Sequence, residues 1–184
     1  MDKEFKERLQ SMNDIDKSIC NNYFVKREAI DKILNVLRKN ELIKREPFGN
    51  ANSKVCFVVD FEKTNDKSIE IIKKYYEANN LDVYNSYFTP FEKTDNVNIN
   101  IATLEKELAI IKPERVVFIT NTSMPKVQGS MQITMSELDI VLKYGKIKDN
   151  ATPTQKDEYT QAKAKLHKIM EFAILGRQCA AQVQ

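Results

Sequence analysis

Hydrophobic positions along residues 52–121 follow two different periods, one typical of strands and one typical of helices. Residues 54–60 and 115–120 are short apolar runs, as expected for strands that are buried on both faces. Residues 68–79 and 101–111 carry apolar side chains at helical spacing, and residues 81–88 are rich in β-forming side chains. This order predicts parallel strands, because parallel pairing needs a crossover connection.

The flanking segments complete the predicted architecture. Residues 1–46 are expected to be helical, with an apolar stripe inside residues 28–43 that consists of Ile30, Ile33, Leu34 and Leu37. Residues 131–134 are a fourth candidate strand, and a long helix is expected to follow Thr154. We therefore predict an α/β three-layer sandwich with a central, mostly parallel four-stranded sheet. Residues 1–46 would be a helical N-terminal extension, and residues 47–184 the α/β domain.

Polar and aromatic side chains follow three of the predicted strands. In open parallel sheets, ligands bind beyond the carboxyl ends of the strands. Asp60 ends the first strand and is followed by Phe61 and Glu62, whereas Tyr87, Phe88 and Phe91 lie on or just after the second. Beyond the third strand come Asn121, Thr122 and Ser123. We expect the functional site at this edge.

Charge and cysteine content narrow the functional classes only slightly. The 184 residues include 29 basic and 26 acidic side chains, a net charge of +3, so a nucleic-acid partner would require a local basic patch. The three cysteines form no CxxC pair, which favours free thiols in a reducing compartment. No run approaches the roughly 20 apolar residues that span a bilayer. We expect a soluble, cytoplasmic protein without membrane contact.

Several common chemistries lack the residues that they need. The chain has only four glycines and neither a GxGxxG nor a GxxxxGK[ST] motif, so a backbone cradle for phosphates is not expected. Its single histidine, His167, lies within a lysine-rich predicted helix, where a surface role is favoured over catalysis. Acidic residues are scattered and there is no histidine pair. We predict no cofactor and no metal site.

Three segments of the chain resemble the uracil-DNA glycosylase superfamily, especially its shorter microbial branches. They are NSKVCFVVD at 52–60, DVYNSYFT at 82–89 and LEKELAIIKPERVVFI at 104–119, of which the last, a helix followed by Ile-Lys-Pro and an apolar strand, is the most telling. With a looser match at 134–137, the resemblance covers about two thirds of the chain. It implies the fold named above and an ancestry among enzymes that flip a uracil out of DNA and cleave its glycosidic bond.

The positions that the resemblance assigns to catalysis carry different residues here. Asp60 takes the place of the carboxylate that positions water, but Phe61 and Lys63 replace the small residues that let the backbone approach the base. Tyr87 stands where the family reads uracil with an asparagine amide. The loop whose histidine stabilises the developing base anion is represented by Met135, Ser136 and Glu137, and a carboxylate there would repel an anion. These departures predict a domain without glycosylase activity.

The first hypothesis is therefore a non-catalytic glycosylase-like domain that binds DNA or a protein of replication or repair. Aromatic side chains at a sheet edge can stack on bases, although alternation along the strand should bury some of them. Nearby lysines would supply a rim that faces phosphates, namely Lys63, Lys67, Lys93, Lys126 and Lys143, diluted by Glu62, Glu92 and Asp95.

Two alternatives stay open. The chain could be a divergent glycosylase, or another hydrolase, that uses Asp60 and Glu62. It could instead be a structural or regulatory subunit of a larger assembly, such as a viral accessory factor, in which the N-terminal helical segment and the final helix are docking surfaces.

Overall fold

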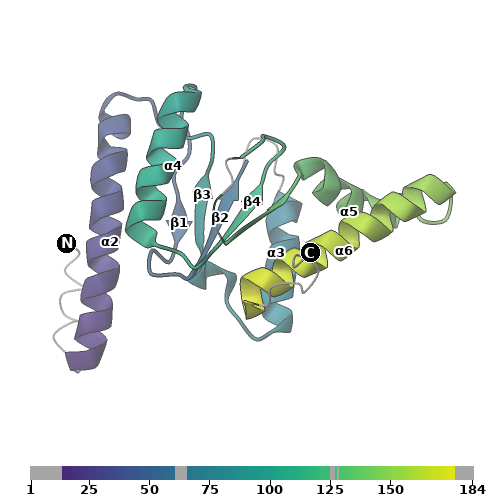
Figure 1. Cartoon of the computed structure of the whole chain (residues 1–184), viewed down its shortest axis with the longest axis horizontal. Helices are drawn as coiled ribbons and strands as arrows, with labels where there is room; N and C mark the ends of the chain where they lie inside the picture. Colours follow the sequence, from purple (N-terminus) through teal and green to yellow (C-terminus); the bar gives the residue numbers. More distant parts are fainter. Residues whose placement is uncertain (1–13, 61–65, 125–126, 128, 177–184) are drawn as a thin grey trace.

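The computed structural model describes residues 14–60, 66–124, 127 and 129–176 and has an α/β architecture with one mixed sheet of five strands. The strand order is β1-β3-β2-β4-β5 (Figure 1). The strands are β1 (Phe48–Gly49), β2 (Val55–Val59), β3 (Tyr87–Pro90), β4 (Arg115–Ile119) and β5 (Ser130–Ile133). Strands β3, β2, β4 and β5 are parallel neighbours, whereas β1 pairs antiparallel with β3.

Helices cover both faces of this sheet (Figure 1). The first face is covered by α2 (Asp14–Lys39) and α4 (Val97–Ile111). The opposite face is covered by α3 (Asp66–Ala78), α5 (Met135–Ile147) and α6 (Pro153–Leu175). Alternate residues of each strand point to opposite faces, so β2 gives Cys56 and Val58 to the core under α2 and α4, and Val55, Phe57 and Val59 to the other core.

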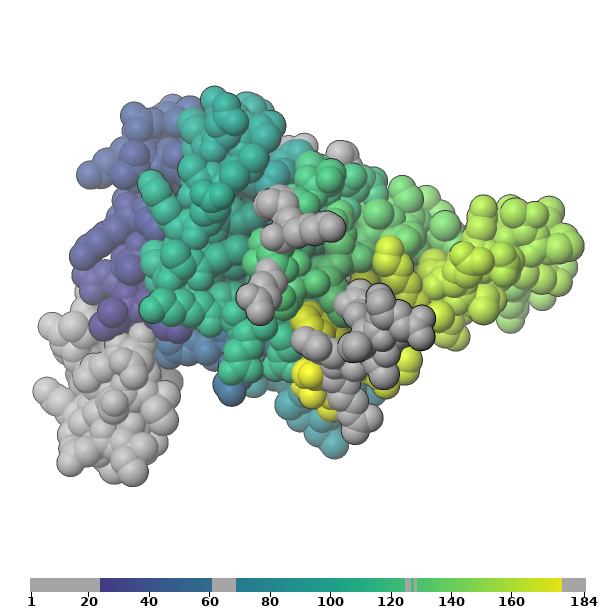
Figure 2. Space-filling view, in the orientation of Figure 1, coloured from purple at the N-terminus to yellow at the C-terminus, as the bar shows by residue number. Residues whose placement is uncertain are grey.

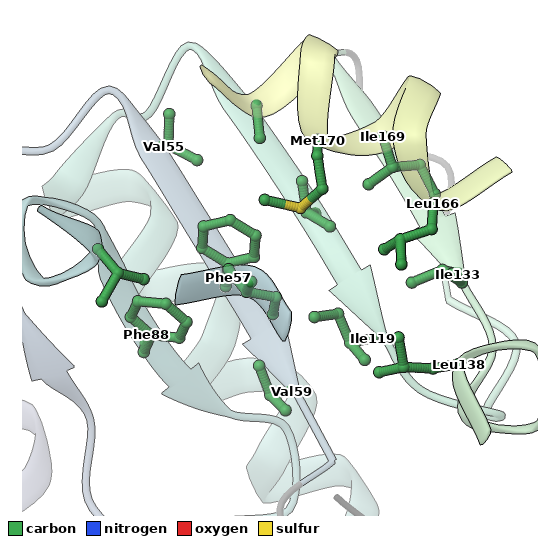
Figure 3. Packing of buried hydrophobic residues seen from close by; sticks show 14 of the residues in the cluster. Val55, Phe57, Val59, Phe88, Ile119, Ile133, Leu138, Leu166, Ile169 and Met170 are labelled. Atoms are coloured by element: carbon green, nitrogen blue, oxygen red, sulfur yellow. The ribbon is translucent and has the colours of Figure 1, made fainter. Parts of the chain in front are cut away.

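The core under α3, α5 and α6 is built from close apolar packing. Phe57 and Phe88 stack with ring centroids 4.8 Å apart, and Leu166, Ile169 and Met170 of α6 reach the strands (Figure 3). Each of these five side chains is at most 2% exposed. Burial of a large apolar side chain stabilises the fold by roughly 1.5–3 kcal/mol, so this layer accounts for a large part of the stability.

Local sequence signals explain where several helices begin and end. Asn96 caps α4 by accepting a hydrogen bond from the Ile99 amide, and Lys112 ends the helix in the left-handed conformation directly before Pro113. Thr134 and Thr152 each begin a helix with a complete capping box, paired with Glu137 and Gln155 respectively.

The predicted α/β class is confirmed, and the differences from the predicted elements are local. Residues 81–86 form a turn and the short 3-10 helix η1 (Val83–Asn85), so the second long strand begins only at Tyr87. The sheet has a fifth strand, β1, which is too short to leave a periodic pattern. Helix α5 was not predicted, although Thr134 and Glu137 have the spacing of a capping box. Helix α2 ends at Lys39, whereas the helical extension was expected to continue to residue 46.

No helix in the described ranges is both long enough and apolar enough to cross a membrane.

Candidate functional site at the strand ends

Asp60 lies at the carboxyl edge of the sheet, as predicted. Its amide donates to the Ile119 carbonyl at 3.0 Å, and the Phe91 amide donates to the Val59 carbonyl at 3.0 Å. The ends of β3, β2 and β4 are therefore adjacent. From β2 the chain leaves toward β3, whereas from β4 it leaves toward β5, so the connections diverge beside Asp60. Such divergence points are where open α/β sheets place their ligands.

The side chain of Asp60 is almost fully enclosed, with 1% of the residue exposed. A carboxylate that is enclosed to this degree does not contact a ligand in the conformation that the structure shows. Phe61 and Glu62, which the sequence assigns to the same turn, lie outside the described residues. Lys63, which was expected to replace a small residue of the family, lies outside them as well.

The loop after β4 meets the first turn of α5. The Asn121 Oδ1 atom accepts a hydrogen bond from the Ser136 amide at 3.2 Å, and Gln132 Nε2 donates to the carbonyls of Thr120 and Thr122, each at 3.0 Å. Asn121, Thr122, Ser123 and Ser136 are all exposed. The structure therefore brings Asn121 and Ser136 together, and their loop is fixed by hydrogen bonds within the chain.

Glu137 is engaged by its own helix and by α6. One carboxylate oxygen accepts from the Thr134 amide at 2.9 Å, and Lys165 Nζ lies 2.7 Å from the other. Burial raises the pKa of Glu137, but the hydrogen bonds from Lys165 and Thr134 outweigh burial and hold this pKa below its usual value. The expected repulsion of an anion is therefore weakened, because Lys165 balances the carboxylate.

The aromatic residues predicted to contact bases are in the core. Tyr87 and Phe88 are 0% exposed and Phe91 is 4% exposed. Phe88 is stacked between Phe57 and Phe48, with ring centroids 4.8 and 5.0 Å away. The structure therefore corrects the proposal that these rings stack on bases, since none of them reaches solvent. Tyr84, which is 57% exposed, is the aromatic residue of this region that does.

A buried polar cluster lies beneath α4 and consists of Tyr87, Thr89, Lys93 and Glu107, each 0% exposed. The Tyr87 hydroxyl donates to Glu107 Oε1 at 3.0 Å, and the Thr89 hydroxyl lies 3.0 Å from both carboxylate oxygens. Lys93 Nζ lies 2.7 Å from Glu107 Oε2 and donates to the Pro90 carbonyl at 2.6 Å. The expectation that Lys93 faces phosphates is therefore wrong.

The electrostatics of the buried polar cluster follow from its isolation from water. Burial raises the pKa of the Tyr87 phenol far above its usual value, and the Glu107 carboxylate raises it further. Burial lowers the pKa of Lys93, while the ion pair with Glu107 opposes that shift. Cys56 has a raised pKa for the same reason, burial first and Glu107 second. The arrangement fixes the β3–α4 connection to the sheet and is closed to substrates.

Sequence reasoning missed Glu107, although a signal was present. Glu107 lies three residues after Leu104 and four before Ile111, so it shares a helix face with two apolar residues. A carboxylate on the apolar side of a helix requires a buried cationic partner. Lys93 was the nearest candidate after the strand, but lysine is so often exposed that it was placed on the surface.

Among the residues that the structure describes, no group of three or more histidine, cysteine, aspartate or glutamate side chains could hold a metal ion. No protein-family model matches the chain, and no curated protein matches its sequence.

Proposed function

We propose that this chain is a non-catalytic α/β domain of the uracil-DNA glycosylase type that binds nucleic acid. The finer fold assignment is supported by the four adjacent parallel strands and by the helices on both faces of the sheet. The proposal concerns binding, because among the described residues the places of the base reader and of the anion-stabilising histidine carry Tyr87 and Met135 to Glu137.

The position of Tyr87 carries this proposal. In the resemblance, Tyr87 takes the place of the side chain that reads the uracil edge. Here its ring is sealed in the core and its hydroxyl is committed to Glu107. A uracil reader must offer a paired donor and acceptor to the base. Tyr87 offers neither, and exposing it would break the buried polar cluster.

A paired assay tests the proposal. The purified chain is incubated with single- and double-stranded oligonucleotides that contain one uracil, and release of uracil is compared with that by an active glycosylase. The same oligonucleotides are titrated in a fluorescence anisotropy assay at several salt concentrations. We expect no uracil release, and binding that weakens steeply as salt rises. Absence of binding at low salt would contradict the proposed function.

The location of Asp60 favours one second candidate, a divergent glycosylase. Asp60 lies at the point where the connections diverge, where a carboxylate could position a water molecule. In that case uracil release should be measurable and should be lost in Asp60→Asn. Release that persists in Asp60→Asn would point to a contaminating enzyme and would remove this candidate.

The shape of the molecule favours another candidate, a structural or regulatory subunit. Helices α5 and α6 extend together beyond the sheet as an arm (Figure 2). A projecting helical arm can dock on a partner or on a second copy of the chain. Light scattering should then give a mass above 21.3 kDa. A monomer would leave nucleic-acid binding as the better account.

A further inference from the structure

We infer that single-stranded nucleic acid binds on the outer side of α3 and α6, on a basic-aromatic face that consists of Tyr75, Lys156, Tyr159, Lys163 and His167. This inference rests on the proposed function and adds the place of binding. None of these residues belongs to the strand-end edge at which the sequence predicted the site.

The spacing of these residues gathers them on one side of α6. Positions 156, 159, 163 and 167 are separated by three or four residues and therefore share one face of a helix. Lys156, Lys163 and His167 are exposed, whereas Tyr159 is half-buried. From α3, Tyr75 joins this face, because its ring lies 6.1 Å from that of His167.

Lys163 lies close to both tyrosines. Its ammonium is 5.5 Å from the centre of the Tyr159 ring. It also affects Tyr75, because burial raises the pKa of Tyr75 while the positive charge of Lys163 lowers it. The Tyr159 ring stacks on the ring of Tyr144 from α5, with centroids 3.8 Å apart, and this contact fixes its position. The face therefore alternates positive charges with fixed aromatic rings, which is the pattern of surfaces that bind single strands.

The lysines of this face differ from their neighbours in having no acidic partner. On other sides of α3 and α6, Lys73 pairs with Glu77 and Lys165 with Glu137, and on the neighbouring α5 Lys143 pairs with Asp139. Lys156 and Lys163 form no ion pair with any described residue. One acidic residue adjoins the face, since Glu171 lies 3.5 Å from His167 at its end. Unpaired positive charges favour an anionic ligand, because no internal ion pair must be broken first.

A single strand fits this face better than a duplex does. Tyr75 is half-buried and packed against the core, and Tyr159 is half-buried and stacked on Tyr144, so both rings are held rigid and present limited ring area to one base at a time. Unstacked bases can lie on such rings while the phosphates reach flexible lysines, whereas the bases of a duplex are already stacked on one another.

Charge reversal tests this location. The variant Lys156→Glu/Lys163→Glu is compared with Lys39→Glu/Lys106→Glu, which makes the same change of charge at exposed, unpaired lysines on α2 and α4. The probe is a labelled oligothymidine of about 20 nucleotides. We expect the first variant to bind roughly tenfold more weakly than the control and to lower the salt slope by about 1.4, as loss of two phosphate contacts requires. Thermal melting checks that both variants fold.

A second pair of variants tests the aromatic component without changing charge. Tyr75→Leu keeps an apolar side chain against the core but removes the ring, and Tyr84→Leu is the control at an exposed tyrosine elsewhere. We expect a loss of roughly fivefold or more for Tyr75→Leu, as for removal of one stacked base, and little change for Tyr84→Leu.

The outcomes separate the two proposals. If the unaltered chain binds no oligonucleotide, the proposed function fails and this inference fails with it. If it binds but the α6 double variant behaves like the α2–α4 control, the function stands and the location is wrong. Equal displacement of the probe by polyglutamate and by unlabelled oligothymidine would show a general acidic-polymer surface and would also overturn the inference.

Discussion

The two faces of the sheet are stabilised by different chemistry. The core under α3, α5 and α6 contains apolar residues and the buried tyrosine Tyr76. The core under α2 and α4 also encloses an ion pair, between Lys93 and Glu107, together with Tyr87 and Thr89. The outer surfaces of the two layers also differ, in the pairing of their charged side chains. Helix α2 carries several paired charges, such as Arg38 with Glu46, whereas Lys156 and Lys163 of the basic-aromatic face form no ion pair with a described residue.

This difference indicates where the molecule can change. An apolar core tolerates substitutions of similar volume, and the surface above it can acquire new charges without disturbing what lies beneath. A buried ion pair does not tolerate loss of one member, because the remaining charge has no water to solvate it. The α2–α4 layer is therefore expected to be the inflexible part of the fold, and the α3–α6 layer the part available for binding.

The largest effect is expected from breaking the buried ion pair. Glu107→Leu leaves the Lys93 ammonium in the core, where both partners are 0% exposed, and removes the acceptor of Tyr87 and Thr89. We expect a loss of about 3–5 kcal/mol in the free energy of unfolding, measured by urea denaturation at neutral pH. A loss below about 1 kcal/mol, the range of exposed ion pairs, would show that the cluster is open to water.

The double variant Lys93→Met/Glu107→Leu sharpens the same test. It removes both charges and leaves only the hydroxyls of Tyr87 and Thr89 without their acceptor. We expect it to be clearly more stable than Glu107→Leu alone, because replacement of a whole buried pair by apolar residues is often close to neutral. A loss in the double variant that equals the sum of the losses in Lys93→Met and Glu107→Leu would contradict an ion pair.

The sequence predicted the apolar layer better than the polar one. Strands β2 and β4 were predicted within one or two residues, because continuous apolar runs have few other interpretations. The buried polar cluster was not predicted, because lysine and glutamate in isolation indicate the surface. Only the packing of α4 on the sheet places Glu107 opposite Lys93, and this contact joins residues that are 14 positions apart.

A cavity in the core under α3, α5 and α6 should lower the free energy of unfolding somewhat less than Glu107→Leu does. Leu166 is 2% exposed and lies among Ile133, Ile169 and other residues of that core (Figure 3). We expect Leu166→Ala to lower the free energy of unfolding by about 3 kcal/mol and Leu166→Met to lower it by less than about 1.5 kcal/mol. If both variants lost as much as Glu107→Leu, the two layers would be equally intolerant.

The candidate site illustrates a second limit of sequence reasoning. Asp60 and Asn121 were placed correctly at the strand ends, because position along a strand follows from the strand itself. The aromatic residues were misplaced, because which face a side chain takes depends on register and on what covers the sheet. The basic-aromatic face was also missed, since it joins Tyr75 of α3 to His167 of α6 across 92 residues.

Alkaline pH should destabilise the polar layer. Burial raises the pKa of Cys56 and of Tyr87, so the folded chain keeps protons that the unfolded chain loses above about pH 8.5 and about pH 10 respectively. Stability must then fall as pH rises through this range. The lowered pKa of Lys93 has the opposite effect on stability, but Lys93 is a single group. In the other layer the pKa of Tyr76 is also raised, which adds to the loss of stability at high pH.

Cys56→Ala isolates one of these contributions. Urea denaturation between about pH 8 and 10 should show a steeper decline for the unaltered chain than for Cys56→Ala, by at most about 1.4 kcal/mol per pH unit for one group. The offset between the two proteins at neutral pH reports the lost thiol packing, and only the slopes are compared. Parallel slopes would show that the thiol ionises as readily in the folded chain as in the unfolded one.

The smallest effect is expected at the helix caps of the α5–α6 arm. Thr134→Ala removes the side chain that accepts a hydrogen bond from the Glu137 amide, and the Glu137 carboxylate also forms an ion pair with Lys165. We expect the free energy of unfolding to fall by about 1 kcal/mol. Thr152→Ala makes the same change at an exposed cap near the tip of the arm and should cost less. Because the pKa of Glu137 is lowered, its contribution is present above the usual glutamate pKa and is lost as pH falls below that value. The difference between the two variants should therefore narrow in acid. A constant difference from neutral pH to about pH 3, well below the usual glutamate pKa, would show that the Glu137–Lys165 pair does not strengthen this cap.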